Sequence, residues 1–315
     1  PPHVGYNAAL SGLNLNFNRA YFEWKKVDGT WRTSVDARGE RFLPGVDMVR
    51  VDVAQRDAPL FTYAPGRVEE WTVASSALGK GGSRWLPVRH PAPYAGEVFQ
   101  TLCAAHGIAL KPAQIIPALP EGTALIVQHD SAALPEVLRG MLKFSTNLTA
   151  EAVGLTASGA SSQEASAAAM TAWAQLRFGI TGVLGDHSGL GPVSRISAAD
   201  MMQVMIRART TTTGPLLHGL MREMGLAGAD GKEQKASAIR SHAKSGTLNF
   251  VSCLAGYVTA PAGHDLAFAI FTADLQRRDA LTMDQREDPK GGAAWTKRAR
   301  RLQGQLIARW AQLYL

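Results

Sequence analysis

Residues 240–248 read RSHAKSGTL, and two apolar runs rich in β-forming residues follow them, 253–258 (CLAGYV) and 266–271 (LAFAIF). The segment 261–265 (PAGHD) between the runs has the composition of a turn, so the pattern predicts antiparallel strands of one sheet. Gly246 has no side chain to block the edge of that sheet. The stretch therefore predicts an edge that holds a lysine and hydroxyls rigidly and that suits a peptide docked as an extra strand.

A second polar group follows a predicted helix earlier in the chain. Apolar side chains recur at helical spacing in residues 134–142, and Ser145-Thr146-Asn147 comes shortly after them. Serine and asparagine commonly end one helix and begin the next, which is the structural interpretation of this group. However, Ser-x-Asn placed before Lys-(Ser/Thr)-Gly is the order found in penicillin-binding proteins and class A β-lactamases, which add an upstream Ser-x-x-Lys nucleophile.

Four segments extend this likeness: 94–97 (YAGE), 134–153 (LPEVLRGMLKFSTNLTAEAV), 186–190 (DHSGL) and 243–247 (AKSGT). Together they resemble the D-alanyl-D-alanine carboxypeptidases of the penicillin-binding protein 4 type, peptidase family S13. The resemblance covers most of residues 90–275, whereas residues 1–90 match only in general character.

The resemblance implies an α+β fold of the serine β-lactamase and DD-peptidase kind, with an antiparallel sheet flanked by helices and interrupted by inserted β-rich domains. We expect residues 1–128 to form inserted β-rich domains and residues 129–315 to form the C-terminal part of the transpeptidase-like catalytic domain. In the first part, the alternation in 13–18 predicts a strand. An Asp-Gly turn in 27–31 and a β-like stretch at 67–73 predict further strands.

Two helices are predicted in the second part. One runs through the Ala-rich residues 162–178 and ends at Gly179. The other begins after Ser197, which stands in a Ser-x-x-acid pattern and is interpreted as a helix cap and not as a catalyst.

The resemblance implies a catalytic role for Ser145, Asn147 and Lys244. Ser145 would relay a proton, because a hydroxyl both donates and accepts. Asn147 would bind the substrate amide, and Lys244 would supply positive potential for the terminal carboxylate of the substrate.

Substrate-binding residues are implied in two places. The first is Ser245, Gly246 and Thr247. The hydroxyls of Ser245 and Thr247 would bind the carboxylate, and the Thr247 N–H would form half of an oxyanion hole. The second is Asp186 and Ser188, in a loop where His187 replaces the usual glycine of the family. Asp and Ser in such a loop also serve simply to hydrogen-bond the turn, and both interpretations stay open.

The nucleophile of the family is not found. No Ser-x-x-Lys motif precedes Ser145, and Ser241-x-x-Lys244 shares its lysine with the Lys-Ser-Gly element, so we interpret it as a decoy. The chain begins at Pro1-Pro2 without Met or a signal peptide. We therefore expect a processed or truncated chain whose nucleophile lies on a missing upstream segment or a separate N-terminal fragment.

By resemblance, the function is that of a serine-type D-alanyl-D-alanine carboxypeptidase, with DD-endopeptidase action left open. It would act on peptidoglycan stem peptides through an acyl-serine intermediate, would be inhibited by β-lactams, and would work in the periplasm or otherwise outside the cytoplasm. A non-catalytic peptidoglycan-binding protein of the same fold is the first alternative. A β-lactamase is disfavoured by the long region before Ser145, and a polyanion-binding module would rest on charge alone.

Composition adds limits to this interpretation. The 315-residue chain has a formal net charge of +7 and a pI near 9.6, but no nucleic-acid motif accompanies the charge, and 297–301 (KRARR) is interpreted as a solvated helix face. No apolar run is long enough to predict a membrane span. Cys103 and Cys253 are interpreted as buried thiols, with a disulfide left open, and no metal or cofactor site is predicted.

Overall fold

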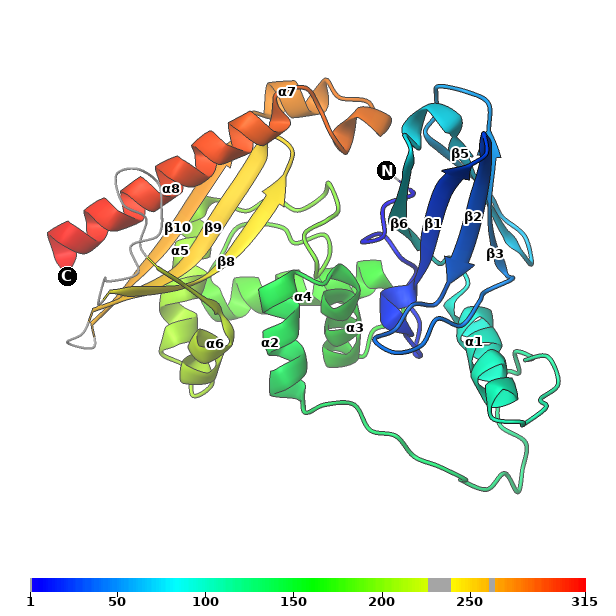
Figure 1. Ribbon diagram of the computed structural model, residues 1–315. Helices are drawn as coiled ribbons and strands as arrows, with labels where there is room; N and C mark the ends of the chain where they lie inside the picture. Colours follow the sequence, from blue (N-terminus) through cyan, green and yellow to red (C-terminus); the bar gives the residue numbers. More distant parts are fainter. Residues whose placement is uncertain (1, 226–238, 261–263) are drawn as a thin grey trace. The chain divides into compact units, whose positions relative to one another are not determined.

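The structure, a computed structural model, describes residues 2–225, 239–260 and 264–315 (Figure 1). The chain divides into two compact units, Pro1–Ser131 and Ala132–Leu315. The interpretation of residues 1–128 as inserted domains and of residues 129–315 as part of a catalytic domain stays a prediction.

The first unit contains two small sheets and one long helix. One sheet is antiparallel, with strand order β2-β1-β6; the other has the order β3-β5-β4, with β3 parallel and β4 antiparallel to β5. The elements are β1 (Arg19–Val27), β2 (Thr30–Asp36), β3 (Val49–Ala54), β4 (Phe61–Ala64), β5 (Glu69–Ala74), β6 (Gly81–Pro87) and α1 (Pro91–Ala105), with short 3-10 turns at Asn16–Asn18 and Ser75–Ala77. The Asp-Gly turn joins β1 to β2, and the β-like stretch at 67–73 contains most of β5, so both of these predictions are confirmed.

The strand predicted at residues 13–18 is wrong. Residues Asn16–Asn18 form a 3-10 turn with positive φ angles, and β1 begins only at Arg19. The cause lies in the asparagine side chains, which bond to the backbone in place of a neighbouring strand. The carboxamide of Asn18 accepts from the N–H of Leu15 at 3.0 Å and donates to the carbonyl of Ala9 at 2.8 Å.

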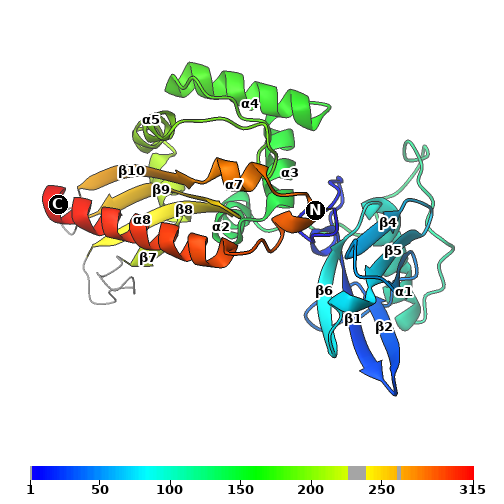
Figure 2. The same ribbon diagram turned by 90° about the horizontal axis from the view of Figure 1, so that it is seen from above.

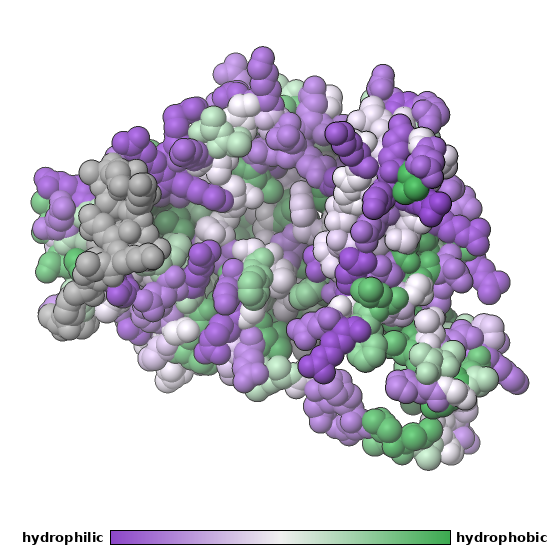
Figure 3. Space-filling model, viewed as in Figure 1, coloured by the Kyte–Doolittle hydropathy of each residue, from purple (hydrophilic) through white to green (hydrophobic). Residues whose placement is uncertain are grey.

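Large buried side chains from both sheets and from α1 form the core of the first unit, among them Phe22, Trp71, Leu86 and Tyr94. After α1 the chain runs through residues 106–133, which the structure describes throughout, without a helix or a strand. Apolar side chains stay exposed there, including Ile126 at 93 %. The space-filling view shows a group of hydrophobic residues, coloured green, at the surface at its lower right (Figure 3).

The described residues of the second unit form a four-stranded antiparallel sheet with the order β10-β9-β8-β7, and helices pack against it. Its strands are β7 (Arg222–Gly225), β8 (Arg240–Leu248), β9 (Val251–Thr259) and β10 (Asp265–Ala273). Its helices are α2 (Leu134–Phe144), α3 (Asn147–Ser158), α4 (Gln163–Phe178), α5 (Ala198–Arg209), α6 (Gly214–Leu220), α7 (Leu275–Asp279) and α8 (Gly292–Tyr314), with a 3-10 turn at Asp284–Arg286.

Helices α8 and α5 cover opposite faces of this sheet (Figure 2). Ile307 of α8 belongs to one buried cluster with Leu254 and Phe268, whereas Met205 of α5 belongs to another with Tyr257. Leu254 and Tyr257 both lie on β9 at positions of opposite parity, so the alternation of side chains along a strand divides them between the two faces. The sheet is therefore the middle layer of three.

Most expectations for the second unit are confirmed. The two apolar runs are β9 and β10, while residues 261–263 of the predicted turn lie outside the described residues. Helix α4 begins after Ser162, whose side chain accepts from the N–H of Ala165, and ends at Gly179 in the left-handed conformation. Ser197 caps α5 in a reciprocal capping box with Asp200.

One buried carboxylate connects a sheet of the first unit to its helix. Glu69 of β5 has no exposed surface. It accepts hydrogen bonds from the backbone N–H of Arg89, at 2.8 and 3.0 Å, and of His90, at 2.7 Å. These groups directly precede α1, so the carboxylate fixes where the helix starts. Burial nevertheless raises the pKa of Glu69, since it penalises the charged form more than the hydrogen bonds favour it.

Replacing this carboxylate is expected to destabilise the first unit. Glu69→Ala should lower the free energy of unfolding by about 2–4 kcal/mol, because it leaves a cavity and removes the acceptor of the N–H groups of Arg89 and His90. Glu70→Ala, at the exposed neighbouring position, is the matched control and should change stability by no more than about 0.5 kcal/mol. Denaturant unfolding measures both variants, and equal stabilities would contradict the role given to Glu69.

Candidate active site

Ser145 and Asn147 lie where two helices meet. Ser145 follows the last residue of α2 in the left-handed conformation, with φ 54° and ψ 49°, and its N–H donates to the carbonyl of Met141. Few residues other than glycine adopt this conformation, so the surrounding structure must hold it. Asn147 then begins α3. The helix-boundary interpretation of both residues is therefore confirmed, and the same junction presents a hydroxyl and an amide two positions apart.

Lys244 of β8 reaches this junction from the sheet. Its Nζ donates to Ser145 Oγ at 2.6 Å, across 99 residues of sequence, and also donates to the carbonyl of Ser245. The lysine is half-buried, and this burial lowers its pKa from the ordinary value, because desolvation disfavours the ammonium form. An amine that loses its proton more readily, bonded to a hydroxyl, is suited to proton transfer.

The half of β8 that follows Lys244 has an open edge among the described residues. β9 pairs with the whole of β8, but β7 pairs only with Arg240–Ala243. Residues 245–247 are exposed. A methyl group added at Gly246 would meet only the Cβ of Cys253, at 3.9 Å, so the space beside this glycine is open in the part of the chain that the structure describes. An extended peptide can therefore approach here as an added strand.

Ser241 lies outside the open part of the β8 edge. It is 2 % exposed, and its Oγ donates to the carbonyl of Met224 at 2.8 Å. Because side chains alternate along a strand, Ser241 and Lys244 project from opposite faces of β8. Ser241 therefore has a structural role in this fold, which agrees with its interpretation as a decoy.

Asp186 and Ser188 bond within their own loop, which lies between α4 and α5. The carboxylate of Asp186 accepts from the N–H of Gly189 and of Gly191, each at 2.5 Å. Ser188 Oγ accepts from the N–H of Leu190 at 3.3 Å. These contacts favour the turn interpretation, and a part in substrate binding stays a prediction.

A buried carboxylate of α3 holds the same loop. Glu151 Oε1 accepts from the N–H of His187 at 3.2 Å and of Ser188 at 2.9 Å. The imidazole of His187 bonds to Ser166 Oγ at 2.7 Å and fills the space left by the absent side chain of Gly154. The loop is thus fixed from α3, the helix that begins with Asn147.

The sequence interpretation missed two residues, Glu151 and Arg300. Glu151 lies four residues after Asn147 and so on the same side of α3, but a helical glutamate is ordinarily exposed. Arg300 belongs to the run 297–301 that was interpreted as a solvated face. Its four basic side chains are indeed exposed, but Arg300 Nη2 also donates to Thr247 Oγ1 at 3.4 Å, which corrects that interpretation for one residue.

Metal ligands, cysteines and membrane-spanning helices are the other features of the chain that bear on function. Within residues 2–225, 239–260 and 264–315, no group of three His, Cys, Asp or Glu side chains is placed to hold a metal ion. Cys103 and Cys253 are free thiols and both are partly exposed, so the expectation that they are buried is corrected. None of the described helices combines the length and the hydropathy that crossing a bilayer requires.

The fold is that of a penicillin-binding protein. The structure is similar to that of penicillin-binding protein 4 (dacB) from Haemophilus influenzae, with a TM-score of 0.66 and 21 % identity over 96 % of this chain and 69 % of that one. A structure of the same H. influenzae protein complexed with a β-lactam matches with a TM-score of 0.64 and 22 % identity over 96 % and 71 % of the two chains.

A family model matches almost the whole chain. Residues 5–297 match the model of the D-Ala-D-Ala carboxypeptidase 3 (S13) family, and the chain belongs to this family. The carboxypeptidase DacB of Mycolicibacterium smegmatis is 30 % identical over 269 residues, which are 76 % of this chain and 55 % of that protein. The chain spans about half the length of the curated relatives that it matches, from 40 to 55 %.

The fit between Gly154 and His187 can be tested by a double-mutant cycle. A Cβ at Gly154 would lie 2.2 Å from the imidazole Cγ, so Gly154→Ala should lower the free energy of unfolding by about 1–3 kcal/mol. His187→Ala in the same chain should recover most of that loss, because the space is then vacated.

Gly140→Ala is the control for this cycle. Gly140 lies inside α2 with no atom within 4 Å of the added carbon, so the change should stabilise the protein by up to about 1 kcal/mol. Denaturant unfolding measures the whole set. A Gly154→Ala variant as stable as the parent protein would contradict the described packing.

Proposed function

We propose that the protein is a serine-type D-alanyl-D-alanine carboxypeptidase in which Ser145, Asn147 and Lys244 form part of the catalytic machinery. The observation that carries the proposal is the 2.6 Å hydrogen bond from Lys244 Nζ to Ser145 Oγ, which joins two motifs of the family that are distant in sequence. Membership in the S13 family supports the reaction type, and the open edge of β8 supports a peptide as the substrate.

In the proposed reaction, a serine oxygen attacks the carbonyl carbon between the two terminal D-alanines. The serine gives up its proton to the amine of the lysine in its own Ser-x-x-Lys motif, the C–N bond breaks, and an acyl-serine intermediate forms. Ser145, bonded to the desolvated Lys244, returns a proton to the nitrogen of the departing D-alanine. Water then hydrolyses the ester, and the shortened peptide leaves.

The remaining residues would bind the substrate. Asn147, at the same helix junction as Ser145, would bond the amide of the penultimate residue. The hydroxyls of Ser245 and Thr247 would accommodate the terminal carboxylate, and the Thr247 N–H would contribute to the oxyanion hole. Gly246 would leave room for the peptide backbone. Asp186 and Ser188 would act as supporting residues.

The attacking serine is proposed to lie outside this chain. No Ser-x-x-Lys motif precedes Ser145 in the sequence, and Ser241 is buried and bonded to Met224. The substrate would be the stem peptide of peptidoglycan, which places the proposed activity in the periplasm or elsewhere outside the cytoplasm. β-Lactams would act as inhibitors through the same serine. A complex of the H. influenzae relative with a β-lactam supports this part of the proposal.

A second candidate is a peptidoglycan-binding protein of the same fold without catalysis, because the open edge of β8 would accept a peptide with or without a nucleophile. The two candidates differ in one property that can be measured. An enzyme with an acyl-serine step forms a covalent adduct with a β-lactam, whereas a binding protein does not.

The test uses the complete gene product, incubated with benzylpenicillin, and the intact mass of every polypeptide in the sample. We expect an adduct on a longer chain or on a separate N-terminal fragment. Ser145→Ala and Lys244→Ala should each slow its formation by about a hundredfold or more, because each removes a proton-transfer group. Lys143→Ala, beside the same helix end but exposed, is the matched control and should leave the rate unchanged.

Other outcomes would change the proposal in definite ways. An adduct at Ser241 would overturn the placement of the nucleophile and the structural role of that residue. No adduct on any species would favour the binding protein. Undiminished acylation of the Ser145 and Lys244 variants would remove both residues from the mechanism.

A further inference from the structure

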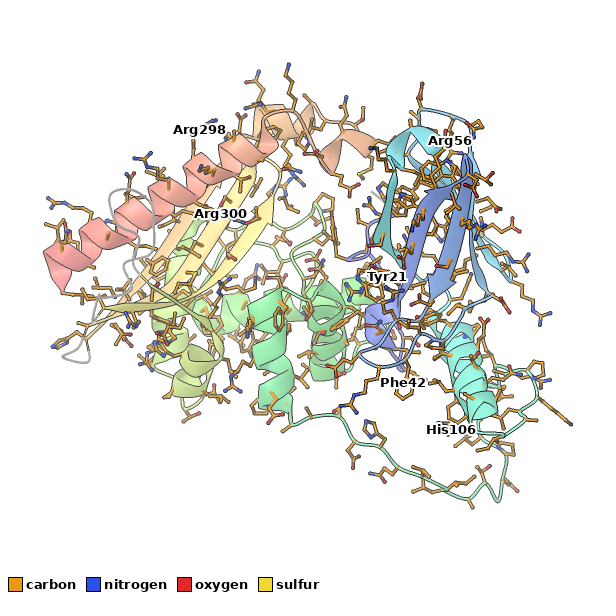
Figure 4. All side chains as sticks on the ribbon, viewed as in Figure 1. Tyr21, Phe42, Arg56, His106, Arg298 and Arg300 are labelled. Atoms are coloured by element: carbon orange, nitrogen blue, oxygen red, sulfur yellow. The ribbon has the colours of Figure 1, made fainter. Side chains whose placement is uncertain are left out.

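One arginine of the C-terminal helix contacts the proposed substrate-binding edge. Arg300 of α8 donates from Nη2 to the hydroxyl of Thr247 at 3.4 Å. Both residues are exposed. Figure 4 shows Arg300 over the strands of the sheet and Arg298 on the outer side of the helix.

The rotation of α8 about its axis determines this placement. The buried residues Ala299, Gln303, Ile307 and Ala311 form one stripe along the helix. Successive residues are turned by about 100°, so Arg300 flanks this stripe while Arg298 lies on nearly the opposite side. The buried stripe, and not the arginine side chain, therefore sets the side of α8 on which position 300 lies.

A buried hydrogen bond fixes the helix close to the edge. Gln303 is 4 % exposed, and its Nε2 donates to the carbonyl of Ser252 at 2.9 Å and to the hydroxyl at 3.2 Å. Ser252 lies directly opposite Thr247 in the pairing of β9 with β8. The helix is thus bonded to the strand position next to Thr247, one turn away from Arg300.

The charge of Arg300 is not neutralised within the described residues. No carboxylate forms an ion pair with it, and the 3.4 Å bond to Thr247 uses one of its five N–H groups. Helix α8 contains no Asp or Glu at all. The Arg300 guanidinium is planar, permanently charged and has unused N–H donors, and it lies beside the exposed residues Ser245 and Thr247. This combination suits the binding of a carboxylate.

We propose that Arg300 is a specificity residue that binds the C-terminal carboxylate of the substrate together with Ser245 and Thr247. This inference rests on the proposed function and adds a group from α8 to the carboxylate site. Lys244 contacts Ser145 on one face of the sheet and adds positive potential for the carboxylate, and Arg300 contacts Thr247 on the other face, where its guanidinium would bind the carboxylate directly. An internal peptide bond, which has no carboxylate, gains nothing from Arg300.

The test compares two probes, Nα,Nε-diacetyl-L-lysyl-D-alanyl-D-alanine and its C-terminal amide, on the complete gene product in which the serine labelled by benzylpenicillin is replaced by alanine, so that neither probe is cleaved. Titrations followed by NMR of threonine methyl groups give both affinities. The parent protein should prefer the acid. Arg300→Ala should lower the affinity for the acid by about three- to tenfold, the range of a partly exposed charged contact, and leave that for the amide unchanged. The affinity of Arg300→Lys for the acid should lie between those of the parent protein and of Arg300→Ala, because lysine keeps the charge but cannot donate two parallel hydrogen bonds to a carboxylate.

Arg298→Ala is the matched control, since it removes the same charge from the outer side of the same helix, and it should keep the full preference for the acid. If Arg300→Ala keeps the preference as well, the role of Arg300 is overturned and the proposed function stands. If the parent protein binds neither probe, or binds both equally, the proposed function fails and the inference with it. The unchanged affinity for the amide also shows that the variant is folded.

Discussion

The hydrogen bond from Lys244 to Ser145 is the contact on which the proposed site depends. It joins the end of a helix to a strand, and each side requires an unusual local arrangement. On the helix side, Ser145 adopts a left-handed conformation, which turns the chain from α2 directly into α3 and leaves its hydroxyl exposed. On the strand side, the sheet buries the lysine enough to lower its pKa while the residues after it stay in solvent.

Strand β8 separates the two tasks of the site because its side chains alternate between the faces of the sheet. Lys244 projects toward the helix junction at Ser145, and Thr247 projects toward α8 and Arg300. Gly246 lies between them at an edge that β7 does not cover. A peptide placed along this edge meets proton-transfer groups from one face and carboxylate-binding groups from the other. Shifting the register of β8 by one residue would exchange the faces and dismantle both sets.

The sequence predicted those features that depend on local pattern. The alternating and apolar runs located β9 and β10, and the caps at Ser162 and Ser197 located the starts of α4 and α5. The family resemblance assigned Ser145 and Lys244 to one site, and the structure places them in contact, although nothing in their sequence spacing requires it.

The features that were missed depend on tertiary contacts or on side chains that compete with the backbone. The alternation at 13–18 failed because Asn18 satisfies backbone groups that a strand would have needed. Glu151 and Arg300 were hidden because charged helical residues are usually solvated. Only the packing of α3 against the loop at 186–191, and the rotation of α8 about its axis, assign them their contacts.

The titration of Lys244 tests most directly whether a desolvated amine is held against Ser145. NMR of the lysine Cε and Nζ nuclei, assigned through Lys244→Arg, follows this group alone. The account predicts a pKa below the ordinary value of about 10.4. Since the folded-state pKa is lowered, the charged amine weakens folding at lower pH, and this effect disappears as the pH rises above the unfolded-state pKa. A Lys244 that titrates at or above the ordinary value would contradict the account, because the amine would then be solvated or paired with an anion and not poised beside the serine.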